Sequence, residues 1–280
     1  MMKLALCILL QDVKVREVRD VAYYQGEGAD EKKHKLDLYL PDTGQPFPVL
    51  MWIHGGGWSM GDRAMYAALG RRFAERGIGC AAISYRLSPG VKHPEHIKDC
   101  ARAFAWLHSN VARHGGDPDR LFVSGQSAGG HLSALLALDR RYLADEKVPE
   151  DALKGTIPMS GVYLILAHPE GSGPMGRMLP QAFGSDKDVC RDASPVTHVK
   201  SCAAPMLVIT ESSGAPLRMQ TALLKAAAQK AGVKGIRFAD AEDRNHFTIV
   251  GRMMREGDDP VRDTICDFVR ERCRELDAKK

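Results

Sequence analysis

The chain has 280 residues, of which 44% are hydrophobic and 26% are charged, and its formal net charge is +4 at pH 7. These values are typical of a soluble globular protein, and the interleaving of basic with acidic residues excludes the basic surface that nucleic-acid-binding proteins carry. Beyond the N-terminus, no segment approaches the roughly 18 apolar residues that a membrane span needs, so we expect none.

Two features of the sequence bear on the cellular compartment. Residues 1–10 place a lysine before a short apolar run, which resembles a degenerate export signal, but no small-residue cleavage site follows. An extended start to the first strand is the other interpretation of this segment. The seven cysteines show no C-x-x-C pair and no framework spacing, which indicates free and mostly buried thiols. The compartment therefore stays open, with a cytoplasmic location slightly favoured over export.

Patterns of apolar residues predict an alternation of strands and helices along the chain. The expected strands are Val15–Tyr24, His34–Leu40, Phe47–Ile53, Gly79–Tyr85, Leu121–Val123, Gly155–Ser160, Pro205–Thr210 and Ile236–Ala239. The expected helices are Ala67–Glu75, His96–Arg113, Ala128–Leu138, Leu217–Ala231 and Pro260–Leu276, and a turn is expected at Asp117–Arg120. Alternation at this spacing favours the α/β class, with a mostly parallel sheet and helices on both faces.

We expect residues 1–280 to form a single domain. Within it, the Gly/Pro-rich residues 162–202 are predicted to be an irregular insertion. A segment of this length is more typical of a cover over a site than of a simple connection between elements.

Ser127 is the central residue of a G-x-S-x-G pentapeptide, which lies between the apolar run Leu121–Val123 and a segment of helix-forming residues. In that context the pentapeptide is typical of a nucleophile elbow, where a sharp turn exposes the serine hydroxyl and only glycine fits on either side. A Gly/Ser-rich turn without chemistry is the alternative that the pentapeptide alone leaves open. We expect Ser127 to be the nucleophile of an acyl transfer.

Acyl transfer by serine also needs a base and hydrogen-bond donors for the oxyanion. The loop His54–Trp58 holds three glycines directly after a buried strand, at the sheet edge where α/β proteins bind ligands. Its backbone N–H groups, together with that of Ala128, are the expected oxyanion hole. Among ten histidines, His246 follows the last short strand and lies well downstream of Ser127, in the chain order nucleophile, acid, histidine. His246 is therefore the expected base.

Several motifs together resemble the α/β-hydrolase superfamily and, within it, the hormone-sensitive-lipase-like carboxylesterases: His54–Trp58, Tyr85–Pro89, Gly116–Arg120 and Gly125–His131. The segments Ser160–Tyr163 and Asn245–Val250 narrow the likeness toward bacterial feruloyl-esterase-like hydrolases and kynurenine formamidases. The resemblance extends over residues 18–268. It implies an eight-stranded sheet, no cofactor and an acyl-enzyme mechanism on small esters or N-formyl amides. It also implies an oxyanion hole formed by Gly56, Gly57 and Ala128.

The residue that should orient His246 departs from the pattern of these relatives, which usually carry an aspartate two to five residues past the preceding strand. The corresponding segment here, Glu211–Arg218, holds no aspartate. Glu211 reaches the histidine from the strand end if its longer side chain compensates for its early position. Alternatively, Ser213 holds the histidine by a neutral hydrogen bond; we favour Glu211. A third source of charge is the group of loop carboxylates near the histidine, for which simple solvation is the preferred interpretation: Asp240, Glu242 and Asp243.

The sequence therefore predicts a serine carboxylic-ester hydrolase that acts on small acyl or aryl esters without a metal or cofactor. Trp58 and Tyr163 are expected to shape the substrate pocket with apolar and aromatic surface. Two alternatives stay open: an arylformamidase acting on N-formylkynurenine, and a catalytically degraded hydrolase that binds a small ligand or partner. The expected partner is a small-molecule ester and not a nucleic acid, and a homodimer stays open.

Overall fold

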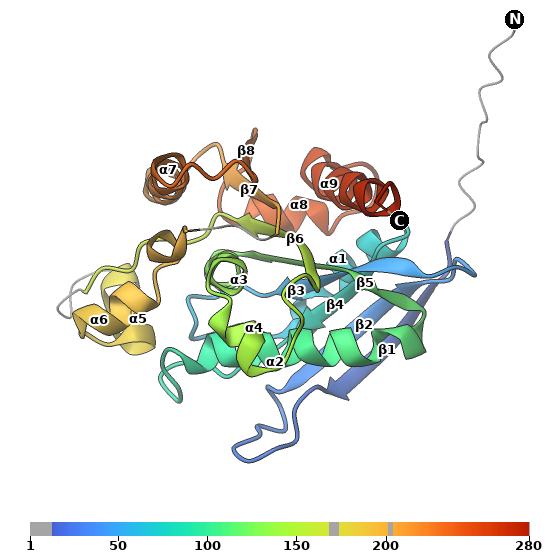
Figure 1. Cartoon of the computed structure of the whole chain (residues 1–280), viewed down its shortest axis with the longest axis horizontal. Helices are drawn as coiled ribbons and strands as arrows, with labels where there is room; N and C mark the ends of the chain where they lie inside the picture. Colours follow the sequence, from blue (N-terminus) through green and yellow to red (C-terminus); the bar gives the residue numbers. More distant parts are fainter. Residues whose placement is uncertain (1–12, 168–173, 201–203, 280) are drawn as a thin grey trace, which may run out of the picture.

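The computed structural model describes residues 13–167, 174–200 and 204–279, and within them eight strands form one sheet (Figure 1). They are β1 (Val15–Ala22), β2 (Lys35–Pro41), β3 (Phe47–Ile53), β4 (Gly79–Ile83), β5 (Gly116–Gln126), β6 (Leu153–Met159), β7 (Met206–Glu211) and β8 (Ile236–Ala241). The sheet order is β1-β2-β4-β3-β5-β6-β7-β8. β2 is antiparallel to β1 and β4, and all other neighbours are parallel. The predicted α/β class and mostly parallel sheet are confirmed.

Helices cover both faces of this sheet (Figure 1). The α-helices are α1 (Ala67–Ala74), α2 (Glu95–Asn110), α3 (Ala128–Leu138), α4 (Arg141–Asp145), α5 (Pro174–Phe183), α6 (Lys187–Asp192), α7 (Ala215–Lys230), α8 (Thr248–Met253) and α9 (Pro260–Asp277). Three short 3-10 helices are η1 (Arg63–Tyr66), η2 (Val111–His114) and η3 (Pro195–His198). Apolar residues of α2, α3 and α7 belong to one core cluster, and those of α1, α8 and α9 belong to the other.

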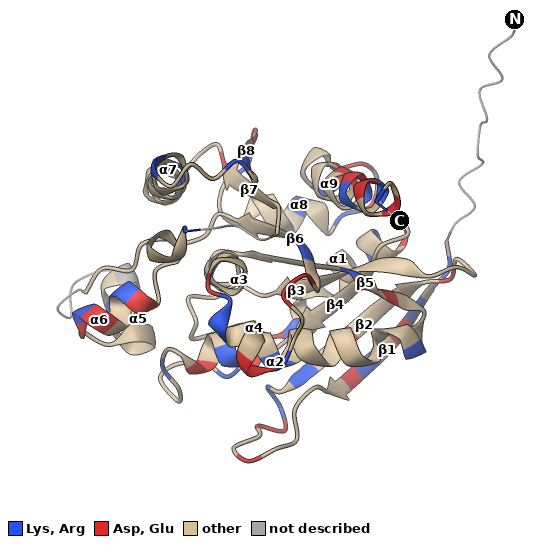
Figure 2. Ribbon diagram, viewed as in Figure 1, with Lys and Arg blue, Asp and Glu red and all other residues tan. Residues whose placement is uncertain are grey.

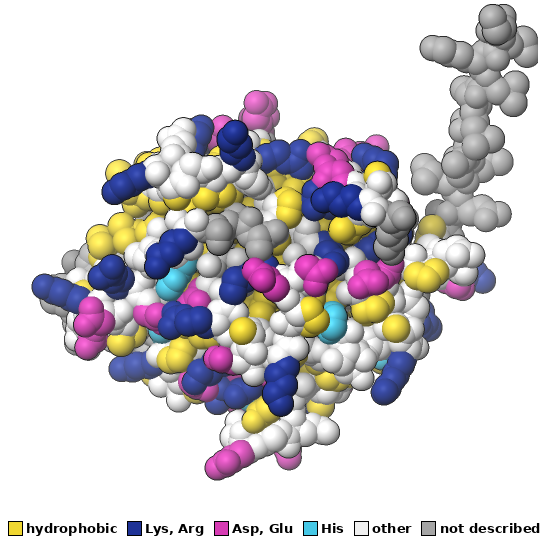
Figure 3. All heavy atoms as spheres, in the orientation of Figure 1, with side chains coloured by type: hydrophobic (Ala, Val, Ile, Leu, Met, Phe, Trp, Pro, Cys, Tyr) yellow, Lys and Arg dark blue, Asp and Glu magenta, His cyan; other side chains and the backbone are white. Residues whose placement is uncertain are grey.

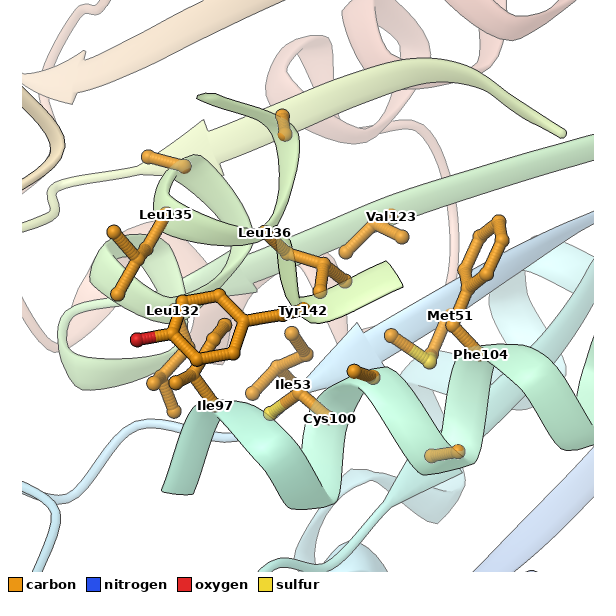
Figure 4. Packing of buried hydrophobic residues seen from close by; sticks show 14 of the residues in the cluster. Met51, Ile53, Ile97, Cys100, Phe104, Val123, Leu132, Leu135, Leu136 and Tyr142 are labelled. Carbon is orange, nitrogen blue, oxygen red and sulfur yellow. The ribbon is translucent and has the colours of Figure 1, made fainter. Parts of the chain in front are cut away.

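The central strand β3 is buried on both faces, as its continuous apolar run predicts. Successive side chains of a strand point to opposite faces, so Met51 and Ile53 lie in one cluster while Leu50 and Trp52 lie in the other. Figure 4 shows part of the first cluster, where side chains of β3, β5, α2, α3 and α4 pack together; the labelled ones are Met51, Ile53, Ile97, Cys100, Phe104, Val123, Leu132, Leu135, Leu136 and Tyr142. All eleven residues of α3 are buried.

Two predictions about local structure were wrong. Asp117–Arg120 is not a turn before the strand but lies within β5: Gly116 already pairs with Phe47 of β3, the register shifts across these four residues, and the ladder resumes where Leu121 pairs with Val49. The insertion is not irregular, because its described residues include α5, α6 and η3. Asp186 caps α6 by accepting from the backbone N–H of Asp188 at 2.7 Å, so the polar and Gly/Pro residues of this segment separate short helices.

Two short helices were not predicted, and one predicted feature lies outside the described residues. The helices α4 and α8 have 5 and 6 residues, too few for a helical period to show in the sequence. Residues 1–10, with their signal-like pattern, lie outside the described residues. Five cysteines within the described residues are free and buried: Cys80, Cys100, Cys190, Cys266 and Cys273.

Charged residues of both signs alternate over the elements of the fold. Figure 2 shows Lys and Arg interleaved with Asp and Glu along the helices, and the face seen in Figure 3 carries the two signs side by side. Among the described residues, no helix combines the length and the apolar composition that crossing a membrane requires.

A buried carboxylate holds the loop that follows β4. Asp99 on α2 has no exposed surface and accepts from Arg86 Nε and Nη2 at 2.9 and 2.7 Å and from Arg102 Nη1 at 3.2 Å. His34 Nε2 lies 2.9 Å from Asp99 Oδ1. Burial alone would raise the pKa of Asp99, but the contacts with His34 and Arg86 outweigh it and lower this pKa to about 2. The Tyr85–Pro89 motif is thereby tied to α2.

Replacing this carboxylate should destabilise the fold. We expect Asp99→Ala to lower the free energy of unfolding at pH 7 by about 3 kcal/mol, because the largely buried Arg86 is then left with the partly exposed Glu95 and the buried His34 Nε2 loses its carboxylate. Urea denaturation measures the change. In the control Asp267→Ala, the side chain removed is 74% exposed beside Arg270, and the expected change is below about 0.5 kcal/mol. Equal effects of the two substitutions would contradict the assignment.

Candidate active site

The polar residues singled out in the sequence meet at the carboxyl ends of adjacent strands. The loop His54–Trp58 leaves β3, Ser127 follows β5, Glu211 ends β7 and His246 follows β8. Parallel strands end at the same edge of a sheet, which is where open α/β folds bind their ligands. The sheet thus brings together Ser127 and His246, which lie 119 residues apart in the chain.

Ser127 occupies the turn between β5 and α3 in a strained conformation. Its φ and ψ are 58° and −116°, outside the regions that a residue with a side chain normally adopts. A Cβ on Gly125 would lie 2.6 Å from the carbonyl oxygen of Ile53, and one on Gly129 would overlap that same oxygen. Only glycine therefore fits on either side of Ser127. The turn has the geometry of the predicted nucleophile elbow.

The side chains of a serine, a histidine and a glutamate form a continuous row of hydrogen-bond contacts. Ser127 Oγ lies 3.0 Å from His246 Nε2, and His246 Nδ1 lies 3.3 Å from Glu211 Oε1. A carboxylate only accepts, so Nδ1 carries the ring proton and Nε2 is free to accept from the serine hydroxyl. Glu211 has no exposed surface, whereas the His246 side chain is 30% exposed. The arrangement can move a proton from the serine to the imidazole.

The other candidates for the acid lie elsewhere. Ser213 Oγ donates to the carbonyl oxygen of Arg244 at 3.0 Å, so it binds the loop of His246 and not its ring. Asp240 pairs with Arg218 at 3.3 Å. Within the described residues, Glu211 is the one carboxylate within 4.0 Å of the His246 ring nitrogens. Glu211 is the last residue of β7, and its side chain reaches the His246 ring from this strand end, the arrangement favoured from the sequence.

The glycine loop after β3 lies against the elbow. A Cβ on Gly55 would lie 3.4 Å from the Cβ of Ser127. Gly56 and Gly57 have φ values of 116° and 58°, in the region that glycine alone adopts readily. Within the described residues, the backbone N–H groups of Gly56, Gly57 and Ala128 donate to no protein acceptor. These three donors beside the nucleophile fit the predicted oxyanion hole.

Two residues of the site were not predicted from the sequence. The side-chain nitrogen of Gln126 lies 3.2 and 3.1 Å from the two ring nitrogens of His246 and donates to its carbonyl oxygen at 3.0 Å. Nδ1 carries a proton and Nε2 accepts from Ser127, so neither ring nitrogen is a free acceptor for Gln126; the bond to the carbonyl is therefore the effective one. Ser160, after β6, donates from Oγ to Glu211 Oε2. Ser160 could have been identified from the strand order, because it follows β6, which lies between β5 and β7 in the sheet.

The two aromatic residues predicted to shape the pocket are buried. Trp58 is 1% exposed, and its ring meets that of His131 edge-on with 5.3 Å between the centroids. Tyr163 has no exposed surface. Their contact with a substrate stays a prediction. Met178 on α5, which was not predicted, has its Sδ where a Cβ on Gly57 would stand, so the insertion reaches the glycine loop.

His131, one turn past the nucleophile, braces the insertion. Its Nε2 donates to the carbonyl oxygen of Ala193 at 2.7 Å, and its Nδ1 accepts from the indole N–H of Trp58 at 3.2 Å. Together the two bonds require a neutral ring, because Nδ1 can accept from the indole N–H only while it carries no proton. Burial lowers the pKa of His131 to about 3. This histidine is held as a structural link between α3 and the residue after α6.

One cluster of the described residues has the composition of a metal site. The ligand atoms of Asp139, Asp192 and His198 lie within 4.8 Å of one another. Arg141 Nη2, however, lies 2.5 Å from a carboxylate oxygen of Asp139 and 2.5 Å from one of Asp192. The guanidinium already supplies the positive charge that a cation would bring, so the cluster is an ion-pair network.

Comparison with known sequences gives a consistent set of matches. A family model described as BD-FAE matches residues 36–222. The chain is 36% identical over 206 residues to the probable carboxylic ester hydrolase LipM of Mycobacterium tuberculosis, covering 68% of this chain and 46% of LipM. It is 31% identical over 261 residues to esterase LipQ of the same organism, covering 86% of this chain and 60% of LipQ. The chain thus spans about half the length of the curated relatives it matches.

Among solved structures, the fold is similar to that of a truncated carbohydrate esterase from gut microbiota. The TM-score is 0.76 at 22% sequence identity, over 94% of this chain and 98% of that one. At this identity the likeness concerns the fold alone, and it confirms the predicted α/β-hydrolase fold.

The neutrality of His131 predicts how stability depends on pH. Burial lowers the pKa of His131 from its ordinary value of 6.5 to about 3 in the folded chain, so between these values the unfolded chain binds one more proton. The free energy of unfolding should therefore fall as the pH drops below about 6.5, by up to about 1.4 kcal/mol per pH unit from this group. Urea denaturation at pH 7 and pH 5 should give a smaller fall for His131→Gln than for the wild type. An unchanged fall would contradict the prediction.

Proposed function

The chain belongs to the BD-FAE family, and from that premise we propose that it is a serine esterase that hydrolyses small acyl or aryl esters through an acyl-enzyme. The proposal depends on one observation: Ser127 Oγ lies 3.0 Å from His246 Nε2, and Glu211 Oε1 lies 3.3 Å from the other ring nitrogen, Nδ1. Names of relatives such as LipM and LipQ, which refer to ester hydrolysis, support the same class of reaction. The ordered serine, histidine and carboxylate weigh against a degraded hydrolase.

Each residue has a separate role in the proposed reaction. His246 Nε2 takes the proton of Ser127 as Oγ forms a bond to the ester carbonyl carbon. The negative charge on the carbonyl oxygen accepts hydrogen bonds from the backbone N–H groups of Gly56, Gly57 and Ala128. His246 then returns the proton to the leaving alcohol or phenol as the ester bond breaks. In the second half, water attacks the acyl-enzyme by the same route, and the acid and free serine are released.

The charge of Glu211 serves this cycle twice. Before the reaction, it holds the His246 proton on Nδ1 and so leaves Nε2 free. During the reaction, it stabilises the imidazolium that forms. Because Glu211 is fully buried and the His246 side chain is 30% exposed, water screens this interaction less than it screens a surface pair, and the effect on the imidazolium is correspondingly stronger.

We place esters ahead of N-formyl amides as substrates because the named relatives are esterases. Met178, whose thioether lies against Gly57, limits the space for a substrate next to the glycine loop. This favours a small acyl group at that position. Turnover of p-nitrophenyl acetate and of N-formylkynurenine under the same conditions compares the two substrate classes. Homodimerisation stays a prediction, which the molar mass from light scattering tests.

Ser127 should be the residue that reacts with an active-site probe. A serine-directed fluorophosphonate is expected to label the wild type at Ser127, and Ser127→Ala should lose the label and about 10⁶-fold in kcat on p-nitrophenyl acetate. Mass spectrometry of the labelled peptide identifies the site. Ser133→Ala, which removes a buried hydroxyl of α3 that bonds to the carbonyl oxygen of Gly130 at 3.0 Å, should label normally. A folded wild type without label at Ser127 would overturn the proposal.

Glu211 should behave as the acid. Glu211→Gln is expected to lower kcat by about 10⁴-fold with little change in KM, because the amide keeps the shape but not the charge that stabilises the imidazolium. The matched controls Asp240→Asn and Asp243→Asn remove carboxylates of the neighbouring loop and should keep nearly full kcat. Steady-state kinetics on p-nitrophenyl acetate measures all three. A loss in Asp243→Asn with none in Glu211→Gln would assign the acid to the loop instead.

A further inference from the structure

Ser160 occupies the space between the strands of the nucleophile and the acid. It follows β6 directly, and in the sheet β6 lies between β5, which leads to Ser127, and β7, which ends at Glu211. Ser160 has no exposed surface. Its backbone N–H donates to the carbonyl oxygen of Ile209 at 2.9 Å, and its Oγ donates to Glu211 Oε2.

The two oxygens of the Glu211 carboxylate therefore have different partners. Oε1 faces His246 Nδ1, and Oε2 accepts from Ser160. A glutamate has one more rotatable bond than an aspartate, and its terminal torsion is broad. A donor on one oxygen fixes that torsion and leaves the other oxygen directed at the imidazole. It also satisfies an oxygen that would otherwise be buried without a partner.

The backbone conformation of Ser160 favours glycine, so the presence of a serine calls for a role of its side chain. Its φ is 46°, in the left-handed region where glycine is the favoured residue. The hydrogen bond from the backbone N–H to Ile209 is available to any residue at this position. What serine adds over glycine is the hydroxyl, and the hydroxyl donates to Glu211.

We propose that Ser160 is a positioning residue that holds Glu211 in the orientation in which it can serve His246. This inference rests on the proposed esterase function and deepens it, because it explains how an acid at the strand end, with a longer side chain, replaces an aspartate farther along the loop. Ser160 touches neither the substrate nor the reacting atoms, and it acts on the rate through Glu211 alone.

The test separates the hydroxyl from the fold. In Ser160→Gly, kcat on p-nitrophenyl acetate should fall about 10–100-fold, the range expected for one hydrogen bond to a buried charge, with KM unchanged. Glycine suits the left-handed backbone, which offsets part of the stability lost when Glu211 Oε2 loses its donor, so the variant should stay folded at the assay temperature, as circular dichroism checks. Ser160→Ala supplies a second variant that also lacks the hydroxyl. The control Ser124→Ala removes a fully buried hydroxyl that donates to Ile157 O at 2.7 Å, and it should keep full kcat.

A double-mutant cycle then identifies the route of the effect. In the Glu211→Ala background, Ser160→Gly should change the residual kcat less than about twofold, because the group that it positions is gone. Full kcat in Ser160→Gly, or equal losses in both backgrounds, would overturn the inference while leaving the esterase function intact. A wild type that neither turns over esters nor reacts with the fluorophosphonate would overturn the proposed function, and this inference with it.

Discussion

A carboxylate without exposed surface is costly unless polar groups surround it, and the geometry of the candidate site follows from that constraint at Glu211. Its two oxygens need donors, and the donors come from the loops after β8 and β6, through His246 and Ser160. Three strand ends are thereby brought to one point. The nucleophile adds the fourth, because the backbone N–H of Ser127 donates to the carbonyl oxygen of Met159, the last residue of β6, at 2.9 Å.

The loop that holds His246 is fixed from both sides. This explains how a loop after the short strand β8 can hold the imidazole in a defined position. Arg244 Nη2 bonds to Asp259 Oδ2 at 2.6 Å, and both side chains are buried. Asp259 also caps α9 by accepting from the backbone N–H of Val261 at 3.1 Å. On the other side, Gln126 donates to the carbonyl oxygen of His246 at 3.0 Å. The base is thus held by the elbow and by the last helix together.

How much could be predicted from the sequence differs from residue to residue, for physical reasons. Ser127 and the glycine loop were accessible because close backbone approach and strained φ values demand glycines at set positions. His246 was accessible from its position after the last strand. The acid stayed open between Glu211 and Ser213, because reach depends on side-chain length and strand register, which no spacing rule contains.

Other features depended on contacts between segments distant in the chain. Gln126 and Ser160 are ordinary polar residues in the sequence, and only the order of strands in the sheet gives them their partners. The helices of the insertion were missed because glycine and proline mark the ends of short helices as well as irregular loops. The three-dimensional arrangement converts such residues into donors for specific acceptors.

The bond between His131 and the carbonyl of Ala193 changes how the insertion should be regarded. If α6 moved away from α3, an imidazole N–H and a carbonyl oxygen would both lose their partner beside an otherwise apolar core, at about 1–3 kcal/mol for each group. The segment from α6 to η3 is energetically continuous with the helix that begins at the nucleophile. It belongs to the folded body of the protein and is not a detachable cover. Met178 on α5, whose Sδ lies where a Cβ on Gly57 would stand, is then a part of that folded body that reaches the glycine loop beside Ser127.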